Sequence, residues 1–409
     1  MDINTKKRFA ELIVKVGVNI KKGQEAVVYA ELDDPDFVYT VVEEAYIAGA
    51  SKVTVEWGHQ PLTKLHVKYR SDEVITTVDD WEVEKLKHRR DTLPCMIYIL
   101  SEDPDGLEGI DGEKYAKMVS ARYQKLKAIR DEMENKYQWC IAAVPGKEWA
   151  KKVFPDLSED QAVEKLWQAI IYTSRADGDP IKNWEEHNKE LHKRADYLNS
   201  LGIKKLKYKA SNGTDLEVGL IENSIFMGGS EETLSGNTFN ANIPTEEIFI
   251  SPKRGEAEGV VYSSKPFSYR GEIIENFHIE FKDGKAVEWG AEKGEKLLGT
   301  LINMDDGSHY LGECALVPFE SPINKTGLLF YNTLFDENAA CHLALGEGFS
   351  NTIKDSEKYT LEECRKMGIN ESMIHEDFMI GTEDLSIIAE TRDGKTVDIF
   401  KNGTWAFSV

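Results

Sequence analysis

The stretch EAVVYAELDDPDFVYTVVEEAYIAGASKVTVEW (residues 25–57) decides the fold of the first half of the chain. It begins with an apolar run (25–30), continues with a helical pattern from Asp34 to Gly49, and ends with a second apolar run (52–57). Short apolar runs that alternate with helical patterns of this length are typical of parallel β–α–β units. The stretch therefore predicts a parallel sheet with helices between its strands.

The same alternation extends in both directions along the chain. The opening residues, MDINTKKRFAELIVKVG, indicate an amphipathic helix. Further on, the apolar runs PCMIYIL (94–100) and QWCIAAVP (138–145) enclose a helical pattern at 112–136, and another amphipathic helix is predicted at 181–202. We predict an α/β fold class, with an N-terminal α/β domain built on a mainly parallel sheet over residues 1–195.

The pattern changes after residue 202. Segments such as KKLKYKA, TDLEVGL and KAVEWG are short and strand-like, and turn sequences separate them. Helical patterns return near residues 291–303, 338–345 and 360–367. The last stretch, KTVDIFKNGTWAFSV, is typical of a β-hairpin with an Asn-Gly turn. We predict a second domain, of mixed α+β type, over residues 196–409.

The charge balance excludes several classes of partner. The chain has 50 Lys and Arg against 72 Asp and Glu, which gives a formal net charge of −22. A field of this sign repels nucleic acid and anionic membrane surfaces. No apolar run approaches the roughly 20 residues that span a bilayer. We therefore expect neither a nucleic-acid partner nor a membrane.

The cysteines and the opening residues favour the cytoplasm. Five cysteines are scattered through the sequence, and no two of them form a CxxC pair. An odd, scattered set is typical of reduced thiols rather than of a disulfide framework. The opening residues show neither a long apolar core nor a small-residue cleavage site, so we expect no signal peptide. Together these features predict a cytoplasmic location.

Acidic and imidazole groups between residues 247 and 377 are the main candidates for chemistry, because the sequence contains no HExxH, Walker A or GxSxG motif. His375 and Asp377 lie two apart in SMIHEDFMIG, and residues i and i+2 of an extended strand point to the same face. Mixed nitrogen and oxygen ligands of this kind suit zinc or cobalt. A chance surface pair is the alternative interpretation.

Glu337 and His342 lie together in LFDENAACHLALG. The stretch NAACHLAL, which ends at Gly346, predicts a short buried helix. Glu337 would lie at its N-terminus, where the helix dipole favours a carboxylate, so a capping acid and a core histidine are one interpretation. Two helical residues five apart diverge by about 140°. Both side chains could therefore reach one metal only if Glu337 lies off the helix.

Glu313 and the pair Glu246–Glu247 complete the candidates. Glu313 lies in the nearly apolar run YLGECALVPF, and a buried carboxylate needs a partner, either a salt bridge or a metal. In NIPTEEIFISP, strand alternation places Glu247 with Phe249 on one face and Glu246 on the other. The pattern alone does not decide which glutamate points inward.

Four segments, taken in order, give the sequence a family resemblance. NIPTEEIFISP (242–252), YLGECALVP (310–318), NTLFDENAACHLALG (332–346) and IHEDFMIG (374–381) resemble those of the aminopeptidase T and aminopeptidase S (PepS-type) family of dinuclear metallopeptidases. The likeness extends over essentially the whole chain. It implies an N-terminal α/β domain, a C-terminal catalytic metal-binding domain and a homodimer.

The resemblance also implies a ligand set. Two divalent metal ions per subunit, zinc or cobalt, would be held by Glu247, Glu313, Glu337, His342, His375 and Asp377. Glu247 is assigned rather than Glu246 because relatives often have Gly at the position before the ligand. Glu313 would bridge the two ions and carry a catalytic role.

One position departs from the family. Relatives place an active-site Tyr seven residues after the motif His, and this sequence has Phe349 there. A phenyl ring cannot donate the hydrogen bond of a phenol. Either the Tyr is dispensable, Tyr310 or Tyr359 substitutes for it, or activity is reduced.

The implied activity is that of a metallo-aminopeptidase, which releases N-terminal amino acids from peptides with a metal-activated water. The free α-amine of the peptide would meet a metal or a carboxylate, and Glu313 or Glu246 would accept the proton of the water. The alternatives are another metallohydrolase, such as a phosphoesterase, and a non-catalytic metal-binding dimeric scaffold. Phosphate chemistry would need Lys or Arg, and the four segments contain none.

Overall fold

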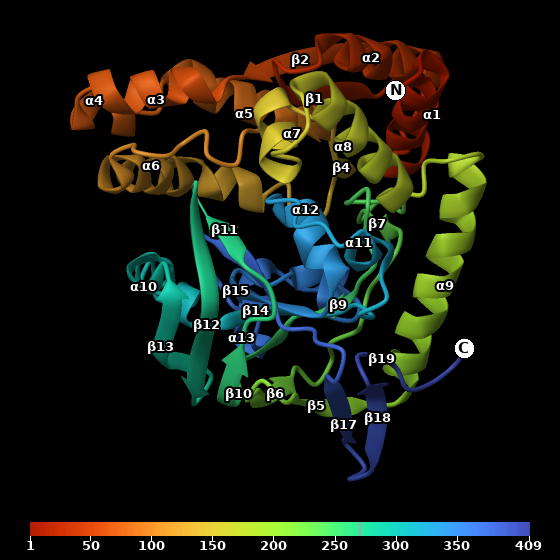
Figure 1. Cartoon of the computed structure of the whole chain (residues 1–409), viewed down its shortest axis with the longest axis vertical. Coiled ribbons are helices and arrows are strands. Elements are labelled where there is room, and N and C mark those ends of the chain that lie inside the picture. Colours follow the sequence, from red (N-terminus) through yellow and green to blue (C-terminus); the bar gives the residue numbers. More distant parts are fainter. Residues whose placement is uncertain (270) are drawn as a thin grey trace. The chain divides into compact units, whose positions relative to one another are not determined.

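The computed structural model describes residues 1–269 and 271–409, and these form two compact units (Figure 1). The first unit comprises Met1–Glu185 and Ser230–Pro244. The second comprises Glu186–Gly229 and Thr245–Val409. Neither unit is one continuous stretch of chain.

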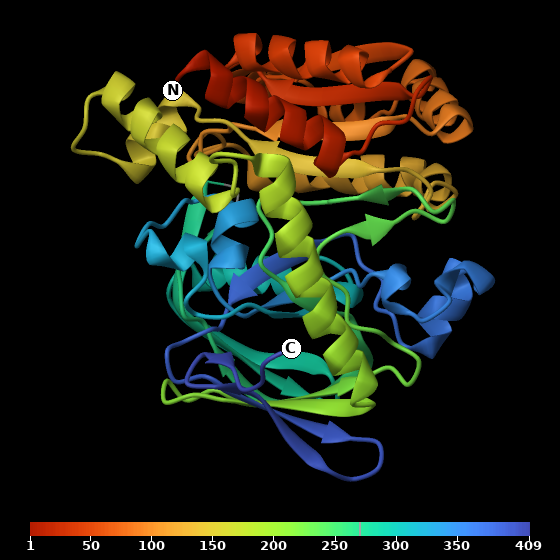
Figure 2. The same ribbon diagram turned by 90° about the vertical axis from the view of Figure 1, so that its right-hand side faces the viewer.

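A parallel four-stranded sheet forms the centre of the first unit, as predicted. Its order is β2-β1-β3-β4, and all three neighbouring pairs are parallel. Its strands are β1 (Glu25–Glu31), β2 (Lys52–Gly58), β3 (Cys95–Leu100) and β4 (Trp139–Ala143). Because β1 lies between β2 and β3, the crossovers run in opposite directions, and right-handed crossovers then place helices on both faces (Figure 2).

The helices of this unit follow the predicted pattern. Helix α2 (Pro35–Ala48) begins after Asp34, whose side chain accepts a hydrogen bond from the Phe37 N–H, and ends at Gly49 in a left-handed conformation (φ 110°). The other helices are α1 (Ile3–Leu12), the π-helical turn η1 (Ile13–Gly17), α3 (Gln60–Tyr69), α4 (Asp72–Thr76), α5 (Asp80–Thr92), α6 (Gly112–Asp131), α7 (Lys147–Val153) and α8 (Glu159–Thr173). A short antiparallel pair, β7 (Glu231–Glu232) and β8 (Thr238–Phe239), completes the unit.

Antiparallel sheet dominates the second unit. Its larger sheet has the order β11-β12-β10-β6-β5-β17-β18-β19, and β13 also pairs with β12. The strands are β5 (Ile203–Lys209), β6 (Asp215–Leu220), β10 (Pro252–Tyr262), β11 (Phe267–Tyr269), β12 (Glu272–Lys282), β13 (Lys285–Lys293), β17 (Ser386–Thr391), β18 (Thr396–Lys401) and β19 (Thr404–Trp405). Helix α9 (Pro180–Ser200) contributes Leu191, Ala195 and Leu198 to the hydrophobic core of this unit. Leu206 and Tyr208 of β5 belong to the same core.

Several local predictions for this unit are confirmed. The terminal hairpin joins β18 and β19 through Asn402 and Gly403, which both have positive φ (53° and 70°) as a tight hairpin turn requires. The helices expected near 291–303 and 360–367 are α10 (Glu295–Ile302) and α13 (Leu361–Met367). The remaining short helices are η2 (Gly307–His309), α11 (Pro322–Lys325), α12 (Thr333–Asp336), η3 (Glu337–Ala339), η4 (Ser350–Thr352) and η5 (Ser356–Lys358).

The helix predicted over residues 338–345 is wrong, because this segment enters a smaller sheet. Glu337–Ala339 forms the 3₁₀ turn η3, and His342–Gly346 forms strand β15. The sheet is antiparallel in the order β16-β15-β14-β9. Its other strands are β9 (Ile248–Ile250), β14 (Leu311–Leu316) and β16 (His375–Met379). Every residue of β15 is buried, so its sequence lacks the alternation that distinguishes a strand from a buried helix.

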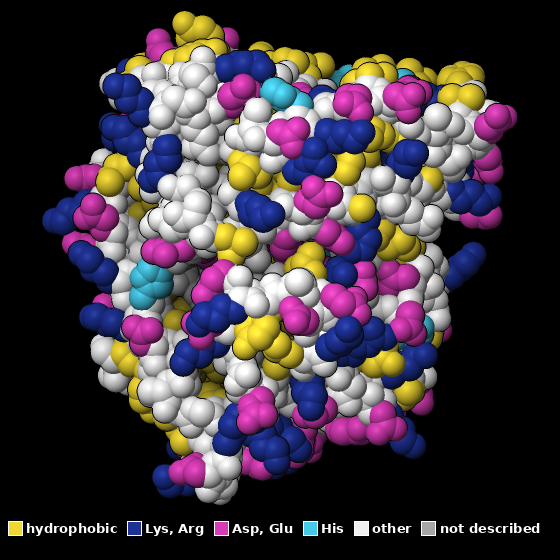
Figure 3. Space-filling view, turned by 180° about the vertical axis from the view of Figure 1, so that it is seen from behind, with side chains coloured by type: hydrophobic (Ala, Val, Ile, Leu, Met, Phe, Trp, Pro, Cys, Tyr) yellow, Lys and Arg dark blue, Asp and Glu magenta, His cyan; other side chains and the backbone are white. Residues whose placement is uncertain are grey.

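The surface carries both signs of charge in close mixture. Figure 3 shows acidic and basic side chains interspersed over the face that it draws, rather than gathered into a basic stripe. Within the described residues, no helix combines the length and the apolar character that crossing a membrane requires.

Candidate metal centre

One face of the smaller sheet gathers the acidic and imidazole side chains. Glu313, Ala344 and Asp377 are register partners across β14, β15 and β16, so their side chains point to the same side. His342 lies two residues before Ala344, and His375 lies two before Asp377, so both imidazoles share that side. The expectation that the His375–Asp377 spacing aims both groups at one face is therefore confirmed.

The opposite face of this sheet packs into the core of the second unit. Ile250, Cys314, Leu343 and Phe378 alternate with the polar positions and belong to that core. A polar face against an apolar one fixes the register, because a shift by one residue would bury the charged groups in the core.

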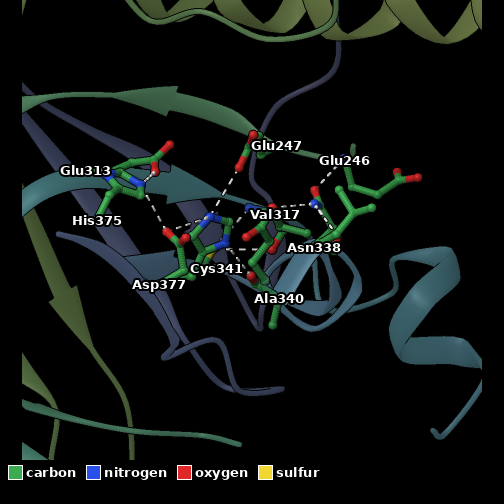
Figure 4. Close-up of polar contacts among 12 residues, drawn as sticks. Glu246, Glu247, Glu313, Val317, Asn338, Ala340, Cys341, His375 and Asp377 are labelled. Carbon is green, nitrogen blue, oxygen red and sulfur yellow. Dashed lines mark hydrogen bonds and ion pairs between the residues drawn. The ribbon is translucent and has the colours of Figure 1, made fainter. Parts of the chain in front are cut away.

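The polar atoms on this face lie close together (Figure 4). Nε2 of His342 is 3.1 Å from Oε2 of Glu247, and Nε2 of His375 is 3.0 Å from Oε2 of Glu313. Oδ1 of Asp377 lies 3.5 Å from Nε2 of His375 and 3.9 Å from Nε2 of His342. The carboxylate of Asp377 thus sits beside both imidazoles.

Two groups of possible metal ligands form here, and they share one residue. Glu247, Glu313 and His342 offer ligand atoms that all lie within 4.8 Å of one another, and so do Glu313, His375 and Asp377. Glu313 is the member common to both groups. A carboxylate has two oxygens, so a residue in this position can contact two ions at once.

Glu337 joins the cluster from η3, off the strand that follows it. Its Oε1 accepts a hydrogen bond of 3.2 Å from Nδ2 of Asn338, and the charge of Asp377 helps to raise the pKa of its carboxyl group. The condition that Glu337 must lie off the helix to share a site with His342 is met, since His342 begins a strand.

Backbone carbonyls fix the orientation of both imidazoles. Nδ1 of His375 lies 2.7 Å from the carbonyl oxygen of Glu347, and Nδ1 of His342 lies 3.3 Å from that of Ala340. A carbonyl oxygen only accepts, so each Nδ1 carries a proton and donates it. Each Nε2 then faces the carboxylates, and a metal that displaced its proton would bind the lone pair that this proton leaves.

Excess negative charge in a buried space shifts the pKa values of these groups. Burial raises the pKa of Glu313 to about 7 and that of Glu337 well above its usual range, and the neighbouring carboxylates add to both shifts. Burial by itself would lower the pKa of His342, but Glu247 and the other carboxylates raise it to about 9. In both cases the cluster retains protons, which a cation could replace.

The donor set fits divalent metal ions. Oδ1 of Asp377 is buried and has no hydrogen-bond partner among the described residues, which leaves it available as a ligand. When ionised, Glu247, Glu313, Glu337 and Asp377 together carry four negative charges, which two divalent cations would balance. Mixed imidazole and carboxylate donors are those that zinc and cobalt accept.

The structure separates the two neighbouring glutamates. Glu247 faces His342, whereas Figure 4 shows the carboxylate of Glu246 directed away from the cluster. Oε1 of Glu246 lies 4.0 Å from Nε2 of His187 on α9 instead. Strand alternation therefore brings Glu247 to the polar face and leaves Glu246 outside it.

Phe349 contacts the cluster through its ring. The ring centroids of Phe349 and His375 are 4.7 Å apart, and Phe249 packs edge-on against Phe349 at 5.6 Å. Tyr310 instead stacks under the guanidinium of Arg254, 4.4 Å from its ring centroid. Phe349 thus supports the imidazole by packing, whereas Tyr310 is engaged elsewhere.

Gly312→Ala is expected to destabilise the second unit and to disturb His375. An added Cβ would collide with the backbone oxygens of Glu347 and Gly346, and the Glu347 oxygen is the one that orients His375. Overpacking of this kind costs about 1–3 kcal/mol, measurable by urea unfolding. Gly112→Ala, where an added Cβ meets nothing within 4 Å, is the control. Equal stability of the two variants would contradict the prediction.

Sequence patterns missed the groups that support these side chains. The carbonyls of Glu347 and Ala340 and the buried amide of Asn338 are brought to the cluster by the fold alone. A backbone carbonyl cannot be recognised from the type of residue that carries it. The only signal for Asn338 in the sequence is that it follows Glu337.

Known proteins resemble the chain over nearly its whole length. The family model of thermophilic metalloproteases (M29) matches residues 3–405. Aminopeptidase AmpS of Bacillus subtilis is 42% identical over 401 residues, 98% of each chain. Aminopeptidase T of Thermus thermophilus is 40% identical over 403 residues, 97% of each chain. The solved structure of wild-type AmpT from Thermus thermophilus matches with a TM-score of 0.89 at 37% identity and covers 99% of both chains.

Proposed function

This chain belongs to the M29 family of thermophilic metalloproteases, and from that premise we propose that it releases N-terminal amino acids from peptides with two divalent metal ions. The observation that carries the dinuclear proposal is the position of Glu313 in both groups of ligand atoms. A carboxylate shared by two mixed nitrogen and oxygen sites would hold two ions close together, as a two-metal hydrolase requires.

The six side chains divide between the two sites. Glu247 and His342 would hold one ion with Glu313, and His375 and Asp377 would hold the other with Glu313. Glu337, whose pKa the charge of Asp377 helps to raise, would complete the ligand set. Zinc or cobalt is the metal that this mixture of donors favours.

The chain's own residues would bind the peptide and move the proton. Bound divalent ions supply Lewis acidity, which lowers the pKa of a water and polarises a carbonyl. Glu313 would accept the proton of the attacking water, because it lies at the centre of the cluster and Glu246 points away. The surrounding carboxylates would attract the free α-amine of the peptide and so limit cleavage to the first peptide bond.

The same proposal covers location, partners and domain roles. Peptides with a free N-terminus are the substrates, and the chain would act in the cytoplasm as a homodimer, without nucleic acid or membrane. Residues 196–409 would form the catalytic metal-binding domain, since all six proposed ligands lie there. Residues 1–195 would form the α/β domain.

A peptide with a free N-terminus and its N-acetylated copy test the activity. Metal-stripped protein is mixed with each peptide, zinc or cobalt is added, and release of the first amino acid is followed. We expect release from the free peptide alone, and only after metal is added, because acetylation removes the amine that the carboxylates attract. Cleavage of both peptides would contradict the aminopeptidase assignment.

Two other outcomes would favour other functions. Metal binding without any cleavage would favour a dimeric scaffold and would make Phe349, at the position where relatives have Tyr, a mark of lost activity. Release of phosphate from a simple ester would favour a phosphoesterase. The charged groups that shift the pKa values of Glu313, Glu337 and His342 are carboxylates and histidines of the cluster itself. A site dominated by carboxylates suits the amine of a peptide better than a negatively charged phosphate.

A further inference from the structure

Asn338 holds together two parts of the metal centre that are far apart in the sequence. Its Oδ1 accepts a hydrogen bond of 2.7 Å from the backbone N–H of Glu246, a residue 92 positions away. Its Nδ2 donates to Oε1 of Glu337 at 3.2 Å and to the carbonyl oxygen of Leu334 at 3.0 Å. The side chain is completely buried, so water does not compete for these bonds.

The amide group fits this place in one orientation only. Oδ1 faces an N–H donor, whereas Nδ2 faces a carboxylate and a carbonyl, which only accept. A flipped amide would set a donor against a donor and an acceptor against two acceptors. An aspartate could keep the bond to Glu246 but would place a second carboxylate against Glu337. Serine and alanine are too short to make both bonds.

The segment that carries Glu247 depends on this bond. The ladder between β9 and β14 begins at Ile248, so Glu246 and Glu247 precede it. Side-chain bonds tie this stretch down: Asn338 binds the N–H of Glu246, and His187 lies 2.8 Å from the carbonyl oxygen of Thr245. Asn338 therefore limits the direction in which Glu247 leaves the backbone (Figure 4).

We infer that Asn338 is a positioning residue that sets Glu337 and Glu247 in one arrangement for metal binding. It contacts Glu337 directly and reaches Glu247 through the adjacent peptide group. Groups that orient metal ligands in this way typically contribute 10–100-fold to metal affinity. The inference rests on the proposed metal-dependent function and adds a residue to its site.

Asn199 offers a control within the same unit. Its side chain also uses both ends, because Oδ1 accepts from the N–H of Phe226 at 2.7 Å and Nδ2 donates to the Phe226 carbonyl at 3.0 Å. It contacts none of the six proposed ligands through these bonds. Asn199 is exposed, whereas Asn338 is completely buried, so Asn199→Ala removes a two-ended clamp at the surface without touching the metal centre.

The test is titration of metal-stripped protein with Co²⁺, followed by its visible absorption spectrum and by calorimetry. We expect Asn338→Ala to bind Co²⁺ about 10–100-fold more weakly than the unaltered protein and to show altered absorption bands. Asn199→Ala should keep both the affinity and the bands. Asn338→Asp, which retains the bond to Glu246 but repels Glu337, should also alter the bands, so it decides the matter if the alanine variant does not fold.

Two results would overturn the inference. One is an Asn338 variant with unchanged affinity and spectrum. The other is equal loss in the Asn338 and Asn199 variants, which would indicate general loosening of the fold. Failure of the unaltered protein to bind either Co²⁺ or Zn²⁺ would instead refute the proposed function, so the two failures are distinguishable.

Discussion

Glu313→Gln is expected to lower kcat by about 10³-fold or more at saturating metal, with KM for the peptide changed far less. Gln has the shape of Glu but carries no charge and cannot accept a proton at neutral pH. Glu313 lies in both ligand groups, so the substitution removes a shared ligand and the proposed base together. The measurement is steady-state release of the first amino acid, with bound metal determined on the same sample.

Glu246→Gln is the matched comparison for this prediction. Glu246 is the other glutamate that the sequence allowed as a base, and its carboxylate is directed away from the cluster. We expect its kcat to fall by less than about tenfold, since no proton transfer is lost. Full turnover by Glu313→Gln with metal bound, or an equal loss in both variants, would contradict the assignment of the base.

We expect zinc or cobalt to raise the melting temperature of the metal-stripped protein by about 10 °C or more. An ion at about 1,000 times its Kd stabilises the folded state by about 4 kcal/mol, and two ions by about twice that. Each kcal/mol raises the melting temperature of a domain of this size by roughly 2–4 °C. The ions would bind tightly only to the folded chain, because the proposed ligands lie between residues 247 and 377 and meet only after folding.

Histidine variants separate this effect from nonspecific binding of metal. His342→Ala removes a buried ligand and should lose at least half of the metal-induced rise in melting temperature. His66→Ala alters an exposed histidine on α3 and should keep the rise in full. A rise of the same size in both variants would place the bound metal outside the proposed centre.

Phe349 and Asn338 affect the centre in different ways. Phe349 packs against the ring of His375, so it restrains one imidazole by shape. Asn338 acts through hydrogen bonds on the opposite side of the ligand set, toward Glu337 and Glu247. The cluster is therefore held by packing at one end and by a buried amide at the other.

The sequence by itself determined the parallel sheet of the first unit. The alternation of EAVVYA, a capped helix and KVTVEW is local, because both periods can be read within about 30 residues. The same holds for the Asn-Gly hairpin at the end of the chain and for the His375–Asp377 pair, whose spacing of two suffices to put both side chains on one face.

Only the tertiary structure decided how the centre is assembled. Strand β15 is buried on both faces, so its sequence could not distinguish it from a helix. Which of Glu246 and Glu247 reaches the cluster depends on the register of β9 against β14. The position of Glu337 at the cluster depends on the turn η3, which ends before β15. The bond from Asn338 to Glu246 joins residues 92 apart, and no local pattern records such a contact, because long-range packing creates it.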